Sequence, residues 1–216
     1  MKITKEIKSE LIDILYKKKL IGITHMSPIS IVIKKNRKFL LPSTLNDLEE
    51  YTKNCCLCEF SKSKSKILFG KGNMNSKIYI IGLNYDYDED GQFFLLKDMI
   101  ENTLHLNIND TYMTNILKCC SSKIYDNCHD EVNQCIPYME QQISIGLPML
   151  IITLGDAFKY MVKTNENINN VTGNLFSYNG IRLVPLMDPE FICKNPSYKE
   201  KMYKDLNKIK KIMDEK

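Results

Sequence analysis

The sequence predicts an α/β protein with a four-stranded parallel sheet flanked by helices. Short, almost continuous apolar runs alternate with longer segments whose apolar residues recur at helical spacing. Strands buried on both faces read as such runs, and the intervening helices supply the crossovers that a parallel sheet requires. The predicted strands cover residues 77–83, 111–117, 149–154 and 181–187.

The helices between these strands are predicted from their periodicity. In residues 129–145, for example, Val132, Ile136, Met139 and Ile143 fall on one face. The other predicted helices cover 94–104, 156–163 and 196–213. Ligand sites in parallel sheets lie beyond the carboxyl ends of the strands. Chemistry is therefore expected at 82–84, Asn115, Gly155 and Asp188.

Residues 1–42 are predicted to form an appendage to a domain that covers residues 43–216. Helical spacing of apolar residues predicts an amphipathic helix over about 4–19. The segment 31–41 has two apolar runs around a Lys-Lys-Asn-Arg-Lys turn, which predicts a short hairpin.

The domain is predicted to open with a helix that leads into the first cysteines. Ser43 or Thr44 can cap this helix, and Leu45, Leu48 and Tyr51 are expected on its inner face.

The composition excludes several classes of protein. The chain has 216 residues, of which 44% are hydrophobic and 26% charged, as in ordinary globular proteins. The longest apolar stretch, 143–154, is too short to span a bilayer, and the start of the chain has no signal-peptide pattern. A cytoplasmic protein without a membrane partner is expected. Its eight cysteines then indicate metal or redox chemistry before disulfides.

Four cysteines have the spacing of metal ligands. Cys55-x-x-Cys58 offers two thiolates from one turn, and Cys119 and Cys135 form a second pair. Such a set suits zinc or an iron–sulfur cluster, and spacing alone does not decide between them. The neighbouring Cys56 and Cys120 are alternatives, whereas Cys128 and Cys193 have no assigned role.

Lysines cluster in two segments of a chain whose net charge is +4. One segment contains Lys62, Lys64, Lys66 and Lys71, and the other is 199–211. Runs of this kind form either solvated faces or surfaces that bind phosphates.

Four motifs in order resemble the iron–sulfur uracil-DNA glycosylases, known as family 4. They are Cys55-x-x-Cys58, the 69–73 segment Phe-Gly-Lys-Gly-Asn, the 115–119 segment Asn-Ile-Leu-Lys-Cys, and Cys135-Ile-Pro-Tyr138. The resemblance covers roughly residues 44–213. It implies the fold of that family, a [4Fe–4S] cluster on Cys55, Cys58, Cys119 and Cys135, and uracil-containing DNA as the partner. Zinc is the alternative metal.

The resemblance also implies roles for individual residues. Phe94 falls where the family stacks an aromatic ring on uracil, and Asn115 falls where an amide pairs with the uracil edge. An amide has both a donor and an acceptor, which suits that edge. The positions expected to contact DNA are Lys62, Lys64, Lys66 and Lys194.

Both catalytic motifs depart from the family pattern. Leu83 stands at the position of a glutamate that assists hydrolysis, and Asp188 stands where a histidine stabilises the uracil anion. Asn84, however, resembles the asparagine that orients water in the mismatch-specific and single-strand-selective branches. Two hypotheses follow. The protein excises uracil by hydrolysing the N-glycosidic bond, or it is a catalytically degenerate iron–sulfur module that binds DNA or a protein partner.

Overall fold

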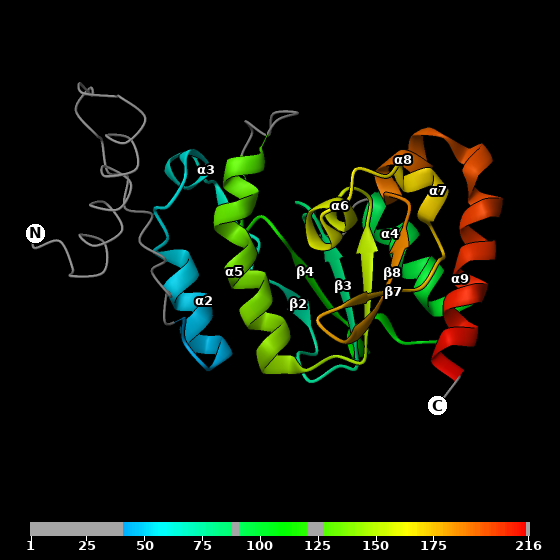
Figure 1. Cartoon of the computed structure of the whole chain (residues 1–216), viewed down its shortest axis with the longest axis horizontal. Helices are drawn as coiled ribbons and strands as arrows, with labels where there is room; N and C mark the ends of the chain where they lie inside the picture. Colours follow the sequence, from blue (N-terminus) through cyan, green and yellow to red (C-terminus); the bar gives the residue numbers. More distant parts are fainter. Residues whose placement is uncertain (1–40, 88–90, 121–127, 215–216) are drawn as a thin grey trace, which may run out of the picture. The chain divides into compact units, whose positions relative to one another are not determined.

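The computed structural model describes residues 41–87, 91–120 and 128–214 (Figure 1). The predicted N-terminal helix and hairpin lie outside the described residues. The proposed division at residue 42 therefore stays a prediction. In the described part of the chain, no helix is both long and apolar enough to cross a membrane.

The central sheet has six strands, in the order β2-β4-β3-β6-β8-β7. Its four central strands are parallel, which confirms the predicted parallel sheet, while β2 and β7 pair antiparallel at the two edges. The edge strands escaped prediction because they span two or three residues without a continuous apolar run. The strands are β2 (Lys71–Gly72), β3 (Ile78–Gly82), β4 (Tyr112–Asn115), β6 (Leu150–Leu154), β7 (Phe176–Tyr178) and β8 (Ile181–Leu186).

A separate two-stranded sheet joins β1 (Lys66–Ile67) to β5 (Cys119–Cys120). It pairs Ile67 with Cys119 and so ties the segment after the Cys-x-x-Cys turn to the third predicted ligand.

The described helices are α2 (Leu45–Lys53), α3 (Glu59–Lys62), α4 (Gly91–Asp98), α5 (His129–Gly146), α6 (Ala157–Val162), α7 (Ile168–Val171), α8 (Pro189–Lys194) and α9 (Lys199–Asp214). Those predicted before the first cysteines and over 94–104, 129–145, 156–163 and 196–213 correspond to α2, α4, α5, α6 and α9, with ends shifted by a few residues, whereas α3, α7 and α8 were not predicted. A π-helical segment, Met99–Thr103, continues α4, and short 3-10 turns cover Ile108–Asp110 and Pro196–Tyr198.

Helix α2 begins as predicted but buries a different residue from the one expected. Thr44 caps the helix, because its hydroxyl accepts a hydrogen bond from the Asp47 N–H at 3.3 Å. The expectation that Tyr51 faces inward is wrong, since its side chain is 42% exposed. Thr52 takes the inner place next to Leu48, and its hydroxyl donates to the Leu48 carbonyl at 2.7 Å.

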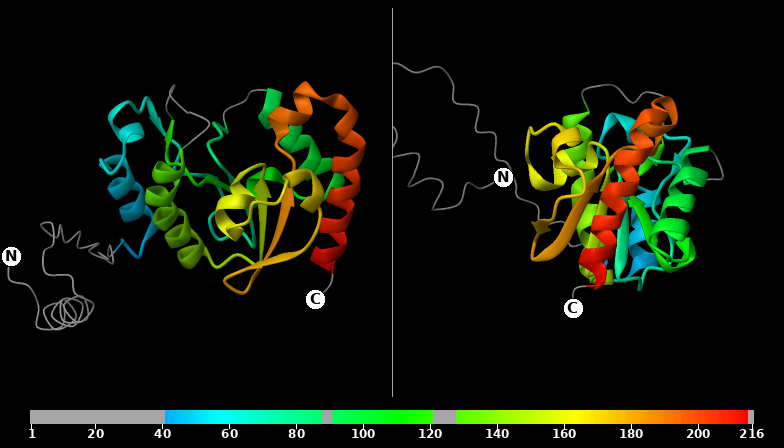
Figure 2. Two further views of the ribbon diagram at one scale, coloured as in Figure 1. Left: turned by 45° about the horizontal axis from the view of Figure 1, so that its top comes forward. Right: turned by 90° about the vertical axis from the view of Figure 1, so that its right-hand side faces the viewer.

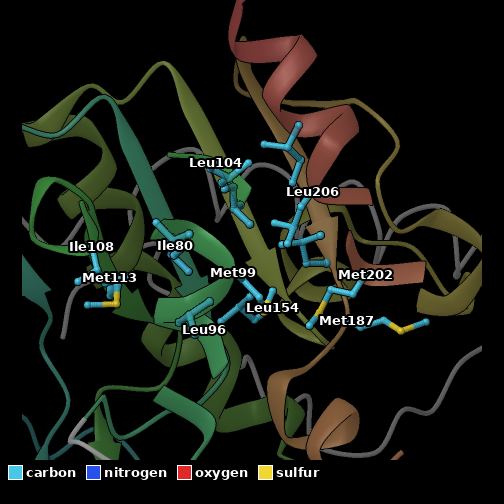
Figure 3. Packing of buried hydrophobic residues seen from close by; sticks show 14 of the residues in the cluster. Ile80, Leu96, Met99, Leu104, Ile108, Met113, Leu154, Met187, Met202 and Leu206 are labelled. Atoms are coloured by element: carbon cyan, nitrogen blue, oxygen red, sulfur yellow. The ribbon is translucent and has the colours of Figure 1, made fainter. Parts of the chain in front are cut away.

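Alternating strand residues build one hydrophobic layer on each face of the sheet. Ile80 and Val184 face α4, α8 and α9 in the first layer, which Figure 3 shows from close by. Tyr79 and Ile151 face α5 and α6 in the second layer. Helices α2 and α3 lie beside α5 at one side of the domain, and α9 lies at the opposite side (Figures 1 and 2).

Candidate functional site

Two predicted catalytic positions share one pocket at the carboxyl ends of the parallel strands. Leu83 follows β3 and Asp188 follows β8, and both line a pocket of about 310 Å³. We call it the strand-end pocket; its lining also includes Gly155, Asp156, Met187 and Phe191. Asp188 is held by its own helix, because Oδ1 accepts a hydrogen bond from the Glu190 N–H at 2.7 Å and caps α8. The fold thus brings the two departures from the family pattern together.

Asn84 lies next to Leu83, and its side-chain amide has no partner among residues 41–87, 91–120 and 128–214. Both Oδ1 and Nδ2 are shielded from solvent without a hydrogen bond to any of the described residues. Buried polar groups nearly always have a partner, from the protein or from water or a ligand. The amide of Asn84 is therefore available to a water molecule or a ligand.

Asn115, by contrast, is fully engaged by the backbone of Tyr85. Its side chain is 1% exposed, with Oδ1 accepting from the Tyr85 N–H at 2.7 Å and Nδ2 donating to the Tyr85 carbonyl at 2.8 Å. The ring of Tyr85 lies against Gly82, where an added Cβ would come within 2.1 Å of Cδ2. The amide predicted to read uracil thus holds the loop after β3 in this structure.

Replacing Asn115 by aspartate is expected to destabilise the protein. The carboxylate has no N–H to donate to the Tyr85 carbonyl and places a buried negative charge against it, which costs about 2–3 kcal/mol of unfolding free energy. Chemical denaturation measures this change. Asn170→Asp, at an exposed position of α7, is the control and should change stability by less than about 0.5 kcal/mol. Equal stabilities of the two variants would contradict a structural role for the Asn115 amide.

The residues after Tyr85 close a second pocket, of about 180 Å³. We call it the turn pocket, because the turn Phe69-Gly70-Lys71 lines it, together with Asn115 and the segment 85–87. Each residue of the 85–87 segment forms a hydrogen bond or ion pair with another part of the chain. Beyond the Asn115 contacts, Lys66 Nζ pairs with Asp86 Oδ1 at 2.8 Å, and Lys71 Nζ donates to the Tyr87 carbonyl at 3.0 Å.

Tyr85 also separates the turn pocket from Asp188. Burial, and after it the nearby Asp188 carboxylate, raise the pKa of Tyr85 far above its usual value. Its hydroxyl is shielded from solvent and lies close to the Asp188 carboxylate. The hydroxyl thus stays neutral.

The predicted stacking residue Phe94 is exposed. Its side chain is 55% exposed on α4, and its ring meets the ring of Phe93 edge-on at 6.3 Å. Phe93 is the buried member of the pair and has Lys71 Nζ 5.1 Å from its ring centroid. Among the described residues that line the two pockets, Phe94 does not occur, so its stacking role stays a prediction.

The four predicted cysteine ligands come from three segments that converge beside α5. Cys55 follows α2, and Cys58 caps α3. Cys119 lies in β5, whose pairing with β1 joins it to the segment after α3, and Cys135 faces inward from α5. Cys119 and Cys135 are buried, at 3% and 5% exposure.

These thiols are close enough to influence one another's ionisation. Burial, and after it the neighbouring Cys58 and Cys55, raise the pKa of Cys119 to about 11. Burial likewise raises the pKa of Cys135 to about 12, with Cys58 and Cys119 adding to the effect. In the described residues, no group of three or more histidine, cysteine, aspartate or glutamate side chains is arranged to hold a metal ion.

Lys118 lies between the cysteines and the turn pocket. Its side chain is 1% exposed, and Nζ donates to Thr114 Oγ1 at 2.8 Å, to the Asn115 carbonyl at 2.6 Å and to Gln142 Oε1 at 2.5 Å. Burial lowers the pKa of Lys118 to about 7, while the Cys135 thiolate raises it. A negative charge nearby therefore favours the charged ammonium.

The four lysines predicted to contact DNA have partners within the protein. Lys62 pairs with Glu59 and Lys194 with Glu190, each at 2.5 Å on an exposed surface. Lys66 pairs with Asp86, as described above. Lys64 instead donates to the backbone carbonyls of Lys53, at 2.6 Å, and Cys55, at 3.2 Å. It stabilises the turn that carries the first cysteines.

Three residues of the site were missed by the sequence argument. Tyr85 directly follows Leu83 and Asn84 but was given no role. Lys118 lies inside a quoted motif but was given no role. Gln142 had no signal, because it is one polar residue on a long helix whose partners come from β4 and the 69–71 turn.

Comparison with known proteins places these motifs in a family. A family model described as the uracil DNA glycosylase superfamily matches residues 69–208. The chain is 29% identical over 189 residues to the type-4 uracil-DNA glycosylase of Saccharolobus solfataricus, covering 80% of this chain and 88% of that protein.

Two further archaeal relatives have the same printed name. The type-4 uracil-DNA glycosylase of Sulfurisphaera tokodaii is 26% identical, over 78% of this chain and 84% of that protein. That of Archaeoglobus fulgidus is 25% identical, over 80% and 95%. The matched residues make up more than half of the chain and include the 69–71 turn, Leu83 and Asp188, so the chain belongs to the uracil-DNA glycosylase superfamily.

Proposed function

We propose that this protein binds uracil-containing DNA and excises uracil by hydrolysing the N-glycosidic bond, with a [4Fe–4S] cluster on its four convergent cysteines. The observation that carries the proposal is the Asn84 amide, buried and without a protein partner at the carboxyl end of β3. Uracil-DNA glycosylase activity is what the printed names of the relatives describe.

Asn84 can supply the orientation that hydrolysis requires. A base that is flipped out of the duplex exposes C1′ of its sugar to a water molecule. The amide oxygen of Asn84 accepts a hydrogen bond from this water and directs its oxygen at C1′. The C–O bond forms as the C1′–N1 bond breaks, the electron pair leaves with uracil, and the water proton passes to solvent.

The strand-end pocket explains why the proposed reaction is slow. Leu83 cannot accept a proton from water, and the Asp188 carboxylate opposes the negative charge that develops on uracil. Each missing group lowers the rate by about 10²–10⁴-fold for a general base or 10²–10³-fold for an anion-stabilising donor.

The donor set of the four cysteines fits an iron–sulfur cluster. Thiolates are the ligands of such clusters, and the electrostatic influence of Cys58 and Cys119 on Cys135 supports the proposal. A bound cluster would link α2, α3, β5 and α5.

Lys62 and Lys194 are the best-supported phosphate contacts. Both lie on helices, α3 and α8, at the edge of the sheet where the parallel strands end (Figure 1). Their ion pairs are exposed and screened by solvent, so a DNA phosphate can replace the carboxylate at little cost. Lys66 is also exposed, and we retain it as a phosphate contact.

The Asn84→Ala variant tests the proposed enzyme. Excision of uracil from single- and double-stranded DNA is measured by strand cleavage after alkali. Loss of the amide is expected to lower the rate about 10²–10³-fold. Removing a buried unpaired amide should not lower the melting temperature. Asn174→Ala, at an exposed position, is the control and should retain full activity. Unchanged excision by Asn84→Ala would contradict the assigned role.

The engaged amide of Asn115 favours a second candidate function. If Tyr85 holds this amide permanently, uracil cannot use it, and the chain is then a catalytically degenerate iron–sulfur module that binds DNA or a protein partner. Absence of excision in the wild type, together with salt-sensitive DNA binding, would support the module instead of the enzyme.

A further inference from the structure

The side chain of Gln142 lies at the centre of a buried hydrogen-bond network behind the turn pocket. It comes from α5 and is fully shielded from solvent. Its Oε1 accepts from Thr114 Oγ1 at 2.9 Å and from Lys118 Nζ at 2.5 Å. Its Nε2 donates to the Phe69 carbonyl at 2.8 Å and to the Tyr112 hydroxyl at 3.0 Å. Both acceptor and both donor positions of the amide are used, so its orientation is fixed.

This network also fixes the peptide group that joins Phe69 to Gly70. The Phe69 carbonyl accepts from two buried donors, Gln142 Nε2 and Thr114 Oγ1, the second at 2.7 Å. Both lone pairs of the carbonyl oxygen are therefore engaged within the protein. The peptide is trans and planar, so its N–H is directed opposite to its C=O. The Gly70 N–H consequently faces away from the network.

Gly70 lies between the network and the turn pocket. An added Cβ would come within 2.2 Å of the Tyr112 hydroxyl, while Gly70 itself is exposed and lines the pocket. Its N–H donates to none of the described residues. Among the described residues that line the pocket, Lys66 and Lys71 are cationic and only Asp86 is anionic. A backbone donor in such surroundings suits an anionic oxygen.

We infer that the Gly70 N–H binds a phosphate oxygen of the DNA strand and that Gln142 is the positioning residue that directs this N–H into the turn pocket. The inference rests on the proposed binding of DNA. The lysines attract the strand over a distance, whereas a donor of fixed direction selects the position of one phosphate. Loss of the Gln142 donor lets the peptide rotate and weakens this one contact, without removing a positive charge from the surface.

A scan of the DNA backbone with methylphosphonate tests the inference. The full-length protein is titrated with single-stranded oligonucleotides that contain 2′-fluorodeoxyuridine, which resists excision, and one uncharged methylphosphonate linkage at successive positions. At one linkage we expect the wild type to lose at least about tenfold in affinity, as for a hydrogen bond to a charged group. Gln142→Glu should lose at most about threefold there, because a carboxylate has no N–H for the Phe69 carbonyl. Linkages that only lysines contact should weaken both proteins equally.

Gln141→Glu is the matched control, since Gln141 is the preceding residue of α5 and its amide donates to the Pro42 carbonyl instead. This variant should respond to every linkage as the wild type does. Thr114→Val serves if Gln142→Glu fails to fold, because it removes the other donor to the Phe69 carbonyl and keeps the size of the side chain. It should likewise lose less than the wild type at the same linkage.

Equal losses of affinity in the wild type and the folded variant at every linkage would overturn the inference, because a residue that only stabilises the fold does not select one phosphate. A variant in which the loss at that one linkage disappears supports it. A wild type whose affinity responds neither to salt nor to any linkage would instead overturn the proposed binding of DNA.

Discussion

The Cys135→Ser variant is expected to lose the broad visible absorbance of an iron–sulfur protein and to unfold far more easily than the wild type. Cys135 is 5% exposed in the middle of α5, so serine there buries a hydroxyl and removes one of four proposed ligands. Loss of a bound metal centre removes binding energy that also stabilises the fold. The expected loss of unfolding free energy is about 4–5 kcal/mol or more, the range typical of a lost metal site.

Cys128→Ser is a close control for this experiment. Cys128 is also buried, at 4% exposure, and lies directly before α5. It has no place among the four proposed ligands. Its serine variant should retain iron, sulfide and visible absorbance, with only the modest destabilisation of a buried hydroxyl. Loss of absorbance in Cys128→Ser but not in Cys135→Ser would show that the ligand set is wrong. A colourless wild type that contains zinc would replace the cluster by a zinc site.

The sequence was sufficient to predict the parallel sheet because each central strand is an almost uninterrupted apolar run. Residues 78–82 and 150–154 can be buried on both faces only between layers of helices. The pattern on α2 was less decisive. Helical spacing predicts Tyr51 on the inner face, but Thr52 can be buried because its hydroxyl donates a hydrogen bond to the Leu48 carbonyl. The periodicity of apolar residues carries no information about this local hydrogen bond.

The candidate site was predictable where motifs specify it and not where distant contacts decide. Spacing predicts the cysteine ligands, and the position after the first central strand predicts chemistry at Asn84; both stay predictions. Whether a side-chain amide is available to a ligand depends, however, on its hydrogen-bond partners in the fold. Asn115 is occupied because a backbone segment thirty residues earlier in the chain meets it, whereas Asn84 meets no such segment in the described chain. Nothing in the local sequence distinguishes these two asparagines.

Restoring the family glutamate by Leu83→Glu is expected to raise uracil excision about 10²–10⁴-fold, the contribution of one general base. The position is suitable, since Leu83 lines the strand-end pocket and only its side chain would change. Its backbone carbonyl stays bound to the Leu117 N–H at 2.9 Å in either variant. Leu83→Gln is the matched control, because it has nearly the same shape as glutamate but cannot accept a proton from water.

Asp188→His adds the second missing group and separates the two candidate functions. Histidine can donate a hydrogen bond to the developing uracil anion, which should raise the excision rate about 10²–10³-fold. The substitution also removes the Asp188 cap of α8, which costs about 0.5–2 kcal/mol of unfolding free energy. The gains of the double variant need not be additive. If the Leu83→Glu/Asp188→His double variant folds and binds DNA but does not excise uracil, the two missing groups are not what prevents excision. The closed arrangement of Tyr85 and Asn115 then excludes the base from the site, as expected of a module that only binds. A double variant that excises uracil rapidly requires the opposite conclusion, that the base reaches the site and Tyr85 moves aside to admit it.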